Sequence, residues 1–354
     1  MEIDSRKQKI LSIIIDEFVK SGEPVGSKTI ASMLDNSVSS ATIRNDMAAL
    51  ERLGLLEQPH TSSGRVPTHL GYRLYIDELM KPAPLSQDEK RMIDNMLGSH
   101  VAAAGDVVEH AVKALSEVTG CAAVNHSNVP NISVISRVEV IPAGRRIYAL
   151  LVITSSGDVK NKVCRVEFDL SYEQIDFIVK FLNRHLQGVK LDDLNQATIQ
   201  NLAVALGSYM MSLSPLLYAI YELTGELAEG KVDISGQEKL LSTDFNTSEV
   251  ANFLSKKDSL ARVLDECFSG VHVFFGKEND RFAISNSSLI LSQYRLGGVE
   301  AGALGIIGPV RLDYAKFIPY IEYFSDSVSK LLTEVVEPDH YKEEREIGGE
   351  KQAE

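Results

Sequence analysis

The sequence predicts an α+β protein with more than one domain. Its 354 residues exceed what one ordinary hydrophobic core holds. Short amphipathic helices fill the first fifty or so residues, whereas runs rich in β-branched residues occupy 132–168 and return after residue 270. The mostly helical segment between these two groups of strands fits an insertion into a sheet.

Composition indicates a folded, soluble chain, because 44% of the residues are hydrophobic and 24% are charged. No apolar run approaches the roughly 18 residues of a membrane helix, and the early "ILSIII" stops at Asp16. We therefore expect a cytoplasmic protein with no signal peptide and no membrane partner. Cys121, Cys164 and Cys267 are scattered and form no CxxC pair, which favours buried, reduced thiols over disulfides or zinc ligands.

Net charge is −13, which taken alone argues against a nucleic-acid partner. Part of the excess negative charge lies in residues 337–354, which contain seven acidic and three basic residues. We expect residues 341–354 to form an acidic disordered tail. Residues 1–80 are nearly neutral, with nine Lys and Arg residues against eleven Asp and Glu residues. A phosphate-binding face in this region has to come from the placement of charges, since bulk charge does not supply it.

Two short helices are expected first. A capping-box pattern, Ser5 with Gln8, begins a helix that ends at Gly22. A turn at residues 23–26 follows, and Ser27 is expected to cap the second helix.

The third helix covers "SSATIRNDMAALERLG", residues 39–54, with Ser39 or Ser40 as its cap and Gly54 at its end. An apolar stripe is expected to pack on the first two helices: Ile43, Met47 and Leu50. The opposite face carries small or forked side chains: Ala41, Arg44, Asn45, Ala48 and Arg52. Short side chains beside Arg and Asn let a bulky partner come close, and these two residue types match guanine and adenine edges in the DNA major groove.

A hairpin is expected directly after this helix. "LLEQPHTSSGRVPT", residues 55–68, is typical of two short strands around a Ser-Ser-Gly tip, with Pro59 and Pro67 on free edges. Such a hairpin is a wing, suited to phosphates or the minor groove, and the alternative is a structural hairpin with a polar tip. Asp46 and Glu51 flank the helix face and would repel phosphate if they pointed at it.

The expected DNA contacts come from the helix and the hairpin. They are Ser39, Ser40, Ala41, Thr42, Arg44, Asn45, Ala48, Arg52, His60, Thr61, Ser62 and Arg65.

Strand and helix patterns continue in the second half of the chain. Residues 132–168 are typical of a three-stranded meander with turns at Gly144 and Gly157. A final helix is expected from Tyr314 to about Val335, with Asp313 as its cap. Its apolar stripe is Phe317, Ile321, Phe324, Val328 and Leu331.

The segment "SSATIRNDMAALERLGLLEQPHTSSGRVPTHLGYRLYIDELM", residues 39–80, closely resembles the start of the HrcA family of bacterial heat-inducible transcription repressors. "GQEKLLSTDF" near residue 236 and "GALGIIGPVRLDYAKFIPYIEYFSDSVSKLL" at 302–332 are similar to later blocks of that family. Between about 85 and 230 the resemblance is weak. The resemblance to this family implies an N-terminal winged helix and a GAF-like α/β domain with an inserted, mostly helical dimerisation domain.

This resemblance divides the chain into five segments. They are a winged-helix DNA-binding domain at 1–80, the first part of a GAF-like domain at 81–170, the inserted dimerisation domain at 171–265, the second part of the GAF-like domain at 266–340, and the tail at 341–354.

The resemblance also implies a function. It is that of a repressor of chaperone operons, which binds double-stranded DNA at an inverted repeat, the CIRCE element, as a homodimer. It is released on heating, and the chaperonin GroEL favours its active form. Partial loss of native packing is a physically reasonable cause of that release.

The residues themselves indicate neither an enzyme nor a cofactor or metal site. The glycine-rich segment 296–308 lacks the spacing of a P-loop or a dinucleotide-binding turn, so tight turns are expected there. The eight histidines show no metal-ligand or nucleophile spacing. The main alternative is a winged-helix regulator of other genes controlled by a small ligand in the GAF-like domain; an enzyme is the less favoured alternative. The role of Arg311 stays open.

Overall fold

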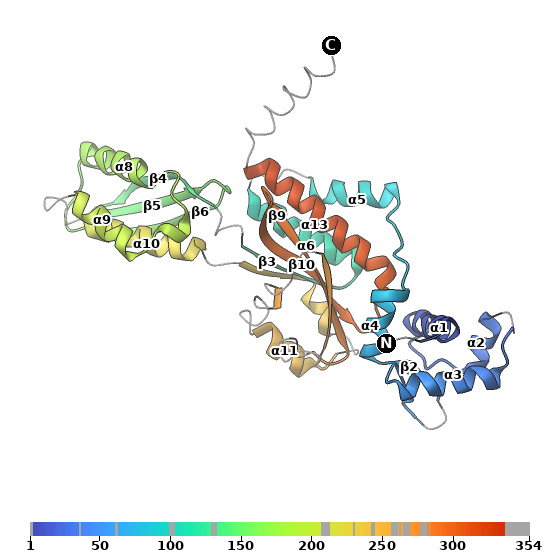
Figure 1. Cartoon of the computed structure of the whole chain (residues 1–354). Coiled ribbons are helices and arrows are strands. Elements are labelled where there is room, and N and C mark those ends of the chain that lie inside the picture. The colour runs from blue at the N-terminus through green and yellow to red at the C-terminus, as the bar shows by residue number, and fades with distance from the viewer. Residues whose placement is uncertain are drawn as a thin grey trace, which may run out of the picture.

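The computed structural model of the chain describes residues 3–336 apart from 35–36, 61–62, 99–102, 129–132, 207–212, 229–230, 242–244, 256–260, 262, 265–269, 277–281 and 283. The expected tail at 341–354 and Cys267 lie outside the described residues. Three lobes follow one another in Figure 1: an N-terminal unit in blue, a central unit built from both halves of the chain, and a green and yellow lobe inserted into it.

The N-terminal unit is the expected winged helix. Its elements are α1 (Ser5–Ser21), α2 (Ser27–Met33), α3 (Ser40–Arg52), β1 (Leu56–Glu57) and β2 (Val66–Pro67). The two strands pair antiparallel, with Leu56 opposite Pro67, and Val25 adds an isolated bridge to Arg65. The bridge ties the start of α2 to the base of the hairpin.

Two of the three helix caps expected in this N-terminal unit are wrong. Asp4, not Ser5, caps α1, and its Oδ1 accepts from the Lys7 backbone N–H at 2.9 Å. A carboxylate at this position also interacts favourably with the helix dipole, which explains the shift by one residue. Ser27 begins α2 but makes no cap bond, because its buried hydroxyl lies 3.0 Å from the hydroxyl of Ser40.

Four helical segments lead from the winged helix to the central sheet. They are α4 (His69–Leu74), a π-helical turn η1 (Tyr75–Leu79), α5 (Gln87–Leu97) and α6 (Ala104–Thr119). Helix α6 packs against the long last helix, α13 (Tyr314–Val336), and against strand β3 (Ala122–Ser127).

The central sheet is antiparallel throughout, with the order β7-β3-β10-β9-β8. Its other strands are β7 (Lys231–Ser235), β8 (Val271–Phe275), β9 (Ser287–Leu296) and β10 (Val299–Pro309). Alternate residues face two cores: Ile290 and Ile306 pack with α6 and α13, whereas Leu289 and Ile307 pack with the 3₁₀ turn η4 (Gln237–Leu241) and α11 (Thr247–Ser255). The central unit is therefore a three-layer α/β domain.

The expected last helix is confirmed. It begins at Tyr314, and the Oδ1 of Asp313 accepts from the Lys316 backbone N–H at 3.2 Å, as a cap does. Ile321 and Phe324 of the expected stripe are fully buried over the sheet.

The inserted lobe has a sheet of its own. The expected meander is present as β4 (Ile135–Gly144), β5 (Ile147–Thr154) and β6 (Val159–Arg165). It is covered by α8 (Tyr172–Leu186), α9 (Gln196–Leu206) and α10 (Ser214–Ala228), with the 3₁₀ turn η2 (Leu191–Asp193) between α8 and α9. The chain leaves the central sheet at Ser127 and returns at Lys231, which face each other in the β3–β7 pair.

The expected boundaries of the insertion are therefore wrong at both ends. Strands β4–β6, expected in the first part of the GAF-like domain, share a core with α8–α10, and β7, η4 and α11, expected in the insertion at 171–265, belong to the central unit. A residue pattern typical of β-strands indicates that a strand exists, but it does not indicate which sheet the strand joins.

Candidate nucleic-acid interface

The two faces of α3 differ as the sequence predicts. Ile43, Met47 and Leu50 are buried in the core of the winged helix. The opposite face reaches solvent: Ala41, Arg44, Asn45 and Arg52 are exposed, and Ala48 is half-buried. This side of α3 is available to a partner.

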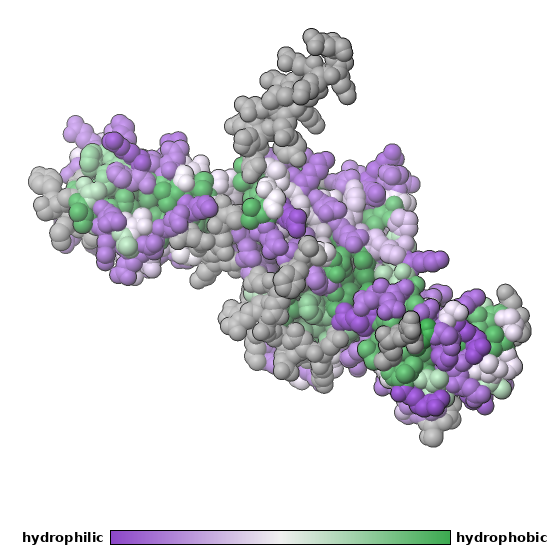
Figure 2. All heavy atoms as spheres, in the orientation of Figure 1, coloured by the Kyte–Doolittle hydropathy of each residue, from purple (hydrophilic) through white to green (hydrophobic). Residues whose placement is uncertain are grey.

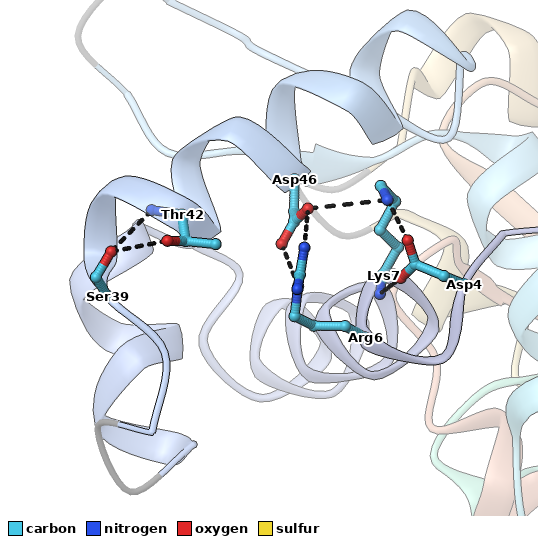
Figure 3. A network of polar contacts seen from close by, with 6 residues as sticks. All are labelled: Asp4, Arg6, Lys7, Ser39, Thr42 and Asp46. Atoms are coloured by element: carbon cyan, nitrogen blue, oxygen red, sulfur yellow. Dashed lines mark hydrogen bonds and ion pairs between the residues drawn. The ribbon is translucent and has the colours of Figure 1, made fainter.

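Ser39 and Ser40 at the start of α3 have different surroundings. Ser39 is exposed and caps the helix, since its Oγ accepts from the Thr42 backbone N–H at 3.1 Å and lies 2.9 Å from the Thr42 hydroxyl. The half-buried Ser40 instead directs its hydroxyl toward Ser27 of α2. Ser39 and Thr42 are shown beside each other in Figure 3.

Asp46 does not face solvent. Its side chain is only 7% exposed, and the Nε and Nη2 of Arg6 donate to its two oxygens at 2.8 and 3.1 Å. Lys7 lies 3.9 Å away and also contacts Asp4, so Asp46 joins a network with the start of α1 (Figure 3). The charge that would have repelled phosphate is neutralised inside the domain.

The second flanking acid, Glu51, is paired with the hairpin. The Nη2 and Nε of Arg65 lie 2.8 and 3.0 Å from its Oε2. The Arg65 side chain is 17% exposed, so it is held against α3 and does not extend from the hairpin tip. Both acids on the flanks of α3 are thus neutralised by cations of the same domain.

A hollow of about 450 Å³ lies between α2, α3 and the hairpin. Its lining includes Lys28, Arg44 and Arg65. Gly64 is required at its rim, because a Cβ there would lie 2.3 Å from the Val25 carbonyl oxygen. Lys28 was not predicted from the sequence, because only the fold brings the start of α2 beside the hairpin.

The hairpin tip is described only in part. His60 is exposed, and Ser63 closes the turn by donating to the His60 carbonyl at 2.7 Å. Thr61 and Ser62, two of the expected contacts, lie outside the described residues.

Family comparisons match this architecture. A model described as "Winged helix-turn-helix transcription repressor, HrcA DNA-binding" matches residues 2–79, and one described as "HrcA protein C terminal domain" matches residues 105–318. The chain belongs to the HrcA family.

Full-length relatives carry the same family name. A protein named "Heat-inducible transcription repressor HrcA" from Clostridium acetobutylicum is 35% identical over 94% of this chain and 98% of its own length. Proteins of the same name from Brevibacillus brevis and Acetivibrio thermocellus are 33% and 31% identical, over 94% and 96% of this chain and 98% and 99% of their own lengths. A crystal structure of a hypothetical protein shares the fold, with a TM-score of 0.67 and 23% identity over 94% of this chain and all of that one.

In this HrcA-family chain the winged helix is fixed to the central unit by aromatic packing. Tyr72 of α4 is fully buried, with ring centroids 5.9 Å from Phe275 and 5.7 Å from Tyr314. Burial raises the pKa of Tyr72 well above its usual range. Arg73 donates to the Val273 carbonyl at 2.8 Å and stacks over Phe275.

Another hollow of the HrcA-family chain, of about 670 Å³, lies between the winged helix and the β10–α13 turn, and its lining includes His69 and Arg311. This places Arg311 at the junction of the two units. The glycine-rich segment 296–308 forms the β9–β10 turn and strand β10, as expected from tight packing.

The described residues form neither a metal-ligand cluster nor a membrane-spanning helix. They contain no group of three or more His, Cys, Asp or Glu side chains able to hold a metal ion. None of the described helices is both long and apolar enough to cross a membrane.

Proposed function

We propose that this chain is a heat-inducible transcription repressor that binds double-stranded DNA through α3 and the hairpin. The observation that carries the proposal is the exposed pair Arg44 and Asn45 on a helix whose acids, Asp46 and Glu51, are both neutralised within the domain. An α-helix with forked donors and small neighbours fits the major groove. The relatives' shared name, which describes a repressor and not an enzyme, supports the same function.

The operator is an inverted repeat, bound by a homodimer. Two copies of α3 related by a two-fold axis match two half-sites of opposite direction. In the family this repeat is the CIRCE element upstream of chaperone operons, and we propose the same class of target for this chain.

The dimer forms through the uncovered face of the inserted sheet. One face of β4–β6 packs on α8 and α10, whereas the residues that alternate with the buried ones are exposed or half-buried. The uncovered face carries apolar side chains on all three strands: Ile141, Ile147, Leu151, Ile153, Val159 and Val163. An antiparallel sheet tolerates one solvated face, but an apolar one is typical of an interface. Apolar residues also reach the surface of this lobe in Figure 2, among hydrophilic ones.

Heat releases the repressor by reducing the fraction of chains with native packing. A modest loss of folded dimer lowers the apparent affinity in proportion. The chaperonin GroEL then acts as a partner by refolding the chain.

A gel-shift titration tests the function. Full-length protein is titrated on an inverted-repeat duplex and on a scrambled duplex at the same stated salt concentration, since affinities depend on salt. A clear preference for the inverted repeat is expected. Equal affinity for both duplexes would contradict the proposal.

A further inference from the structure

Asp46 combines two properties that rarely occur together on an exposed helix. It follows Arg44 and Asn45 directly, yet its carboxylate turns inward and is nearly fully buried. Burying a charge is costly unless it is paired and hydrogen-bonded. The bidentate contact with Arg6 meets that need, as Figure 3 shows.

Among the described residues, polar side-chain contacts join α3 to three different elements. Ser40 contacts Ser27 of α2, Asp46 contacts Arg6 of α1, and Glu51 contacts Arg65 of the hairpin. Hydrophobic packing of the apolar stripe keeps α3 on the core of the domain, but hydrophobic interactions are non-directional. A bidentate carboxylate–guanidinium pair has a fixed geometry, so the Asp46–Arg6 pair limits rotation of α3 about its own axis.

Rotation of α3 matters because base recognition is geometric. Arg44 and Asn45 lie two residues and one residue before Asp46, so any rotation of α3 at Asp46 moves them by the same angle. Bidentate hydrogen bonds to a base edge tolerate little misalignment.

We infer that Asp46 is a positioning residue for DNA sequence recognition: its pair with Arg6 fixes the rotation of α3 and so aims Arg44 and Asn45 at the bases. This inference rests on the proposed function. Lys7 lies between Asp46 and Asp4, the cap of α1, so the same network also connects α3 to the first turn of α1.

Charge alone predicts the opposite effect of removing this carboxylate. A negative charge beside a DNA-binding face weakens binding to every duplex, so its loss strengthens binding to all sequences. Misorientation of Arg44 and Asn45, in contrast, weakens binding only to a duplex whose bases these residues recognise. The two explanations therefore differ in sign on the inverted repeat.

The test uses Asp46→Asn in the full-length protein, which keeps the shape of the side chain and removes its charge. Affinity is measured by titration on the inverted-repeat and the scrambled duplex, and folding is checked by circular dichroism and the melting temperature. We expect about a tenfold loss on the inverted repeat, the scale of one misaligned base contact. Affinity for the scrambled duplex should be unchanged or higher.

Two further variants complete the design. Arg6→Lys keeps the charge but loses the bidentate fork, so it should lower the preference for the inverted repeat without altering net charge. It also keeps the test valid if Asp46→Asn fails to fold. Glu23→Gln, in the exposed turn between α1 and α2, makes the same change in charge away from α3 and should leave the preference unchanged.

Each outcome decides between these explanations. An undiminished preference in both folded Asp46→Asn and Arg6→Lys would overturn the inference and leave the proposed function standing. A melting temperature that falls while the preference stays unchanged would mean that Asp46 is merely structural. Wild-type protein that fails to distinguish the two duplexes would overturn the proposed function, and the inference with it.

Discussion

At the scale of single residues, the candidate interface depends on which charges are free and which are paired. Arg44 is exposed on α3, whereas Arg65 is mostly buried and held by Glu51. In the proposed complex, an exposed Arg on a helix in the major groove is placed to read bases, whereas a cation on the hairpin is suited to phosphates. The two arginines are therefore expected to differ in what they contribute to binding.

Replacing Arg44 should affect sequence preference. Arg44→Ala is expected to cost about 1–3 kcal/mol on the inverted repeat and to relax selectivity at one base position. Fluorescence anisotropy on duplexes with single base changes measures this. Lys20→Ala, an exposed cation on α1, is the control and should leave selectivity intact. An equal loss on every duplex would mean that Arg44 contacts only the backbone.

Replacing Arg65 should affect salt dependence instead. Arg65→Ala is expected to weaken binding to both duplexes by a similar factor and to reduce the slope of log affinity against log salt by about one. Titrations at four or five salt concentrations give the slope. An unchanged slope would show that the pair with Glu51 is only structural.

At the scale of elements, polar contacts attach α5 to α13. Tyr320 and Tyr323 of α13 donate to Glu89 and Asp94 of α5, the latter at 2.9 Å. Hydrogen bonds from the Tyr320 hydroxyl and from the hydroxyl and N–H of Ser86 lower the pKa of Glu89 to about 2. The folded-state pKa is thus below that of a free glutamate.

This shift predicts that acid loosens α5. A depressed pKa contributes stability that is present above the unfolded-state value, near 4.3, and is lost as the pH falls toward 2. The protection of α5 amides from hydrogen exchange, measured relative to free amides at the same pH, should therefore fall over that interval, and Glu89→Gln should remove part of this pH dependence. An identical pH profile in the variant would contradict this cause.

The inserted lobe gives a second prediction at this scale. Val163→Lys places a charge on the uncovered sheet face, where Val163 is 64% exposed in the single chain, so the fold should tolerate it. We expect a monomer by light scattering, with weaker operator binding. Val204→Lys, at an 80% exposed position of α9, is the matched control and should stay dimeric. A dimeric Val163→Lys protein would place the interface elsewhere.

Local periodicity explains which elements were predicted from the sequence. The stripe of α3 and the meander of β4–β6 were predicted because their buried and exposed residues alternate with a regular period. Strand β3 was missed because all six of its residues are buried, so it shows no alternation. Long-range pairing, such as Lys28 beside the hairpin or Asp46 with Arg6, has no local signal at all.

At the scale of the whole molecule, the winged helix depends on the central unit for its attachment. Tyr72, Phe275 and Tyr314 come from three distant parts of the chain and meet at this junction. We therefore expect that heat which loosens the central sheet also frees the DNA-binding unit, so that folding is coupled to operator release.

This coupling predicts the effect of weakening the junction. Tyr72→Ala should cost about 3–5 kcal/mol, the range for truncating a buried aromatic side chain, and should lower the melting temperature and the temperature of operator release together. Calorimetry and operator binding measured along a temperature series give both values. A lower melting temperature with unchanged release would separate the two processes.

The central claim is that α3 reads bases in the major groove of two symmetric half-sites. Methylation protection tests it most directly, because dimethyl sulfate attacks guanine N7 in that groove. The wild-type protein should protect guanines at symmetric positions of the inverted repeat, and Arg44→Ala should restore reactivity at one guanine in each half-site. Full guanine reactivity on DNA saturated with the wild-type protein would contradict the claim.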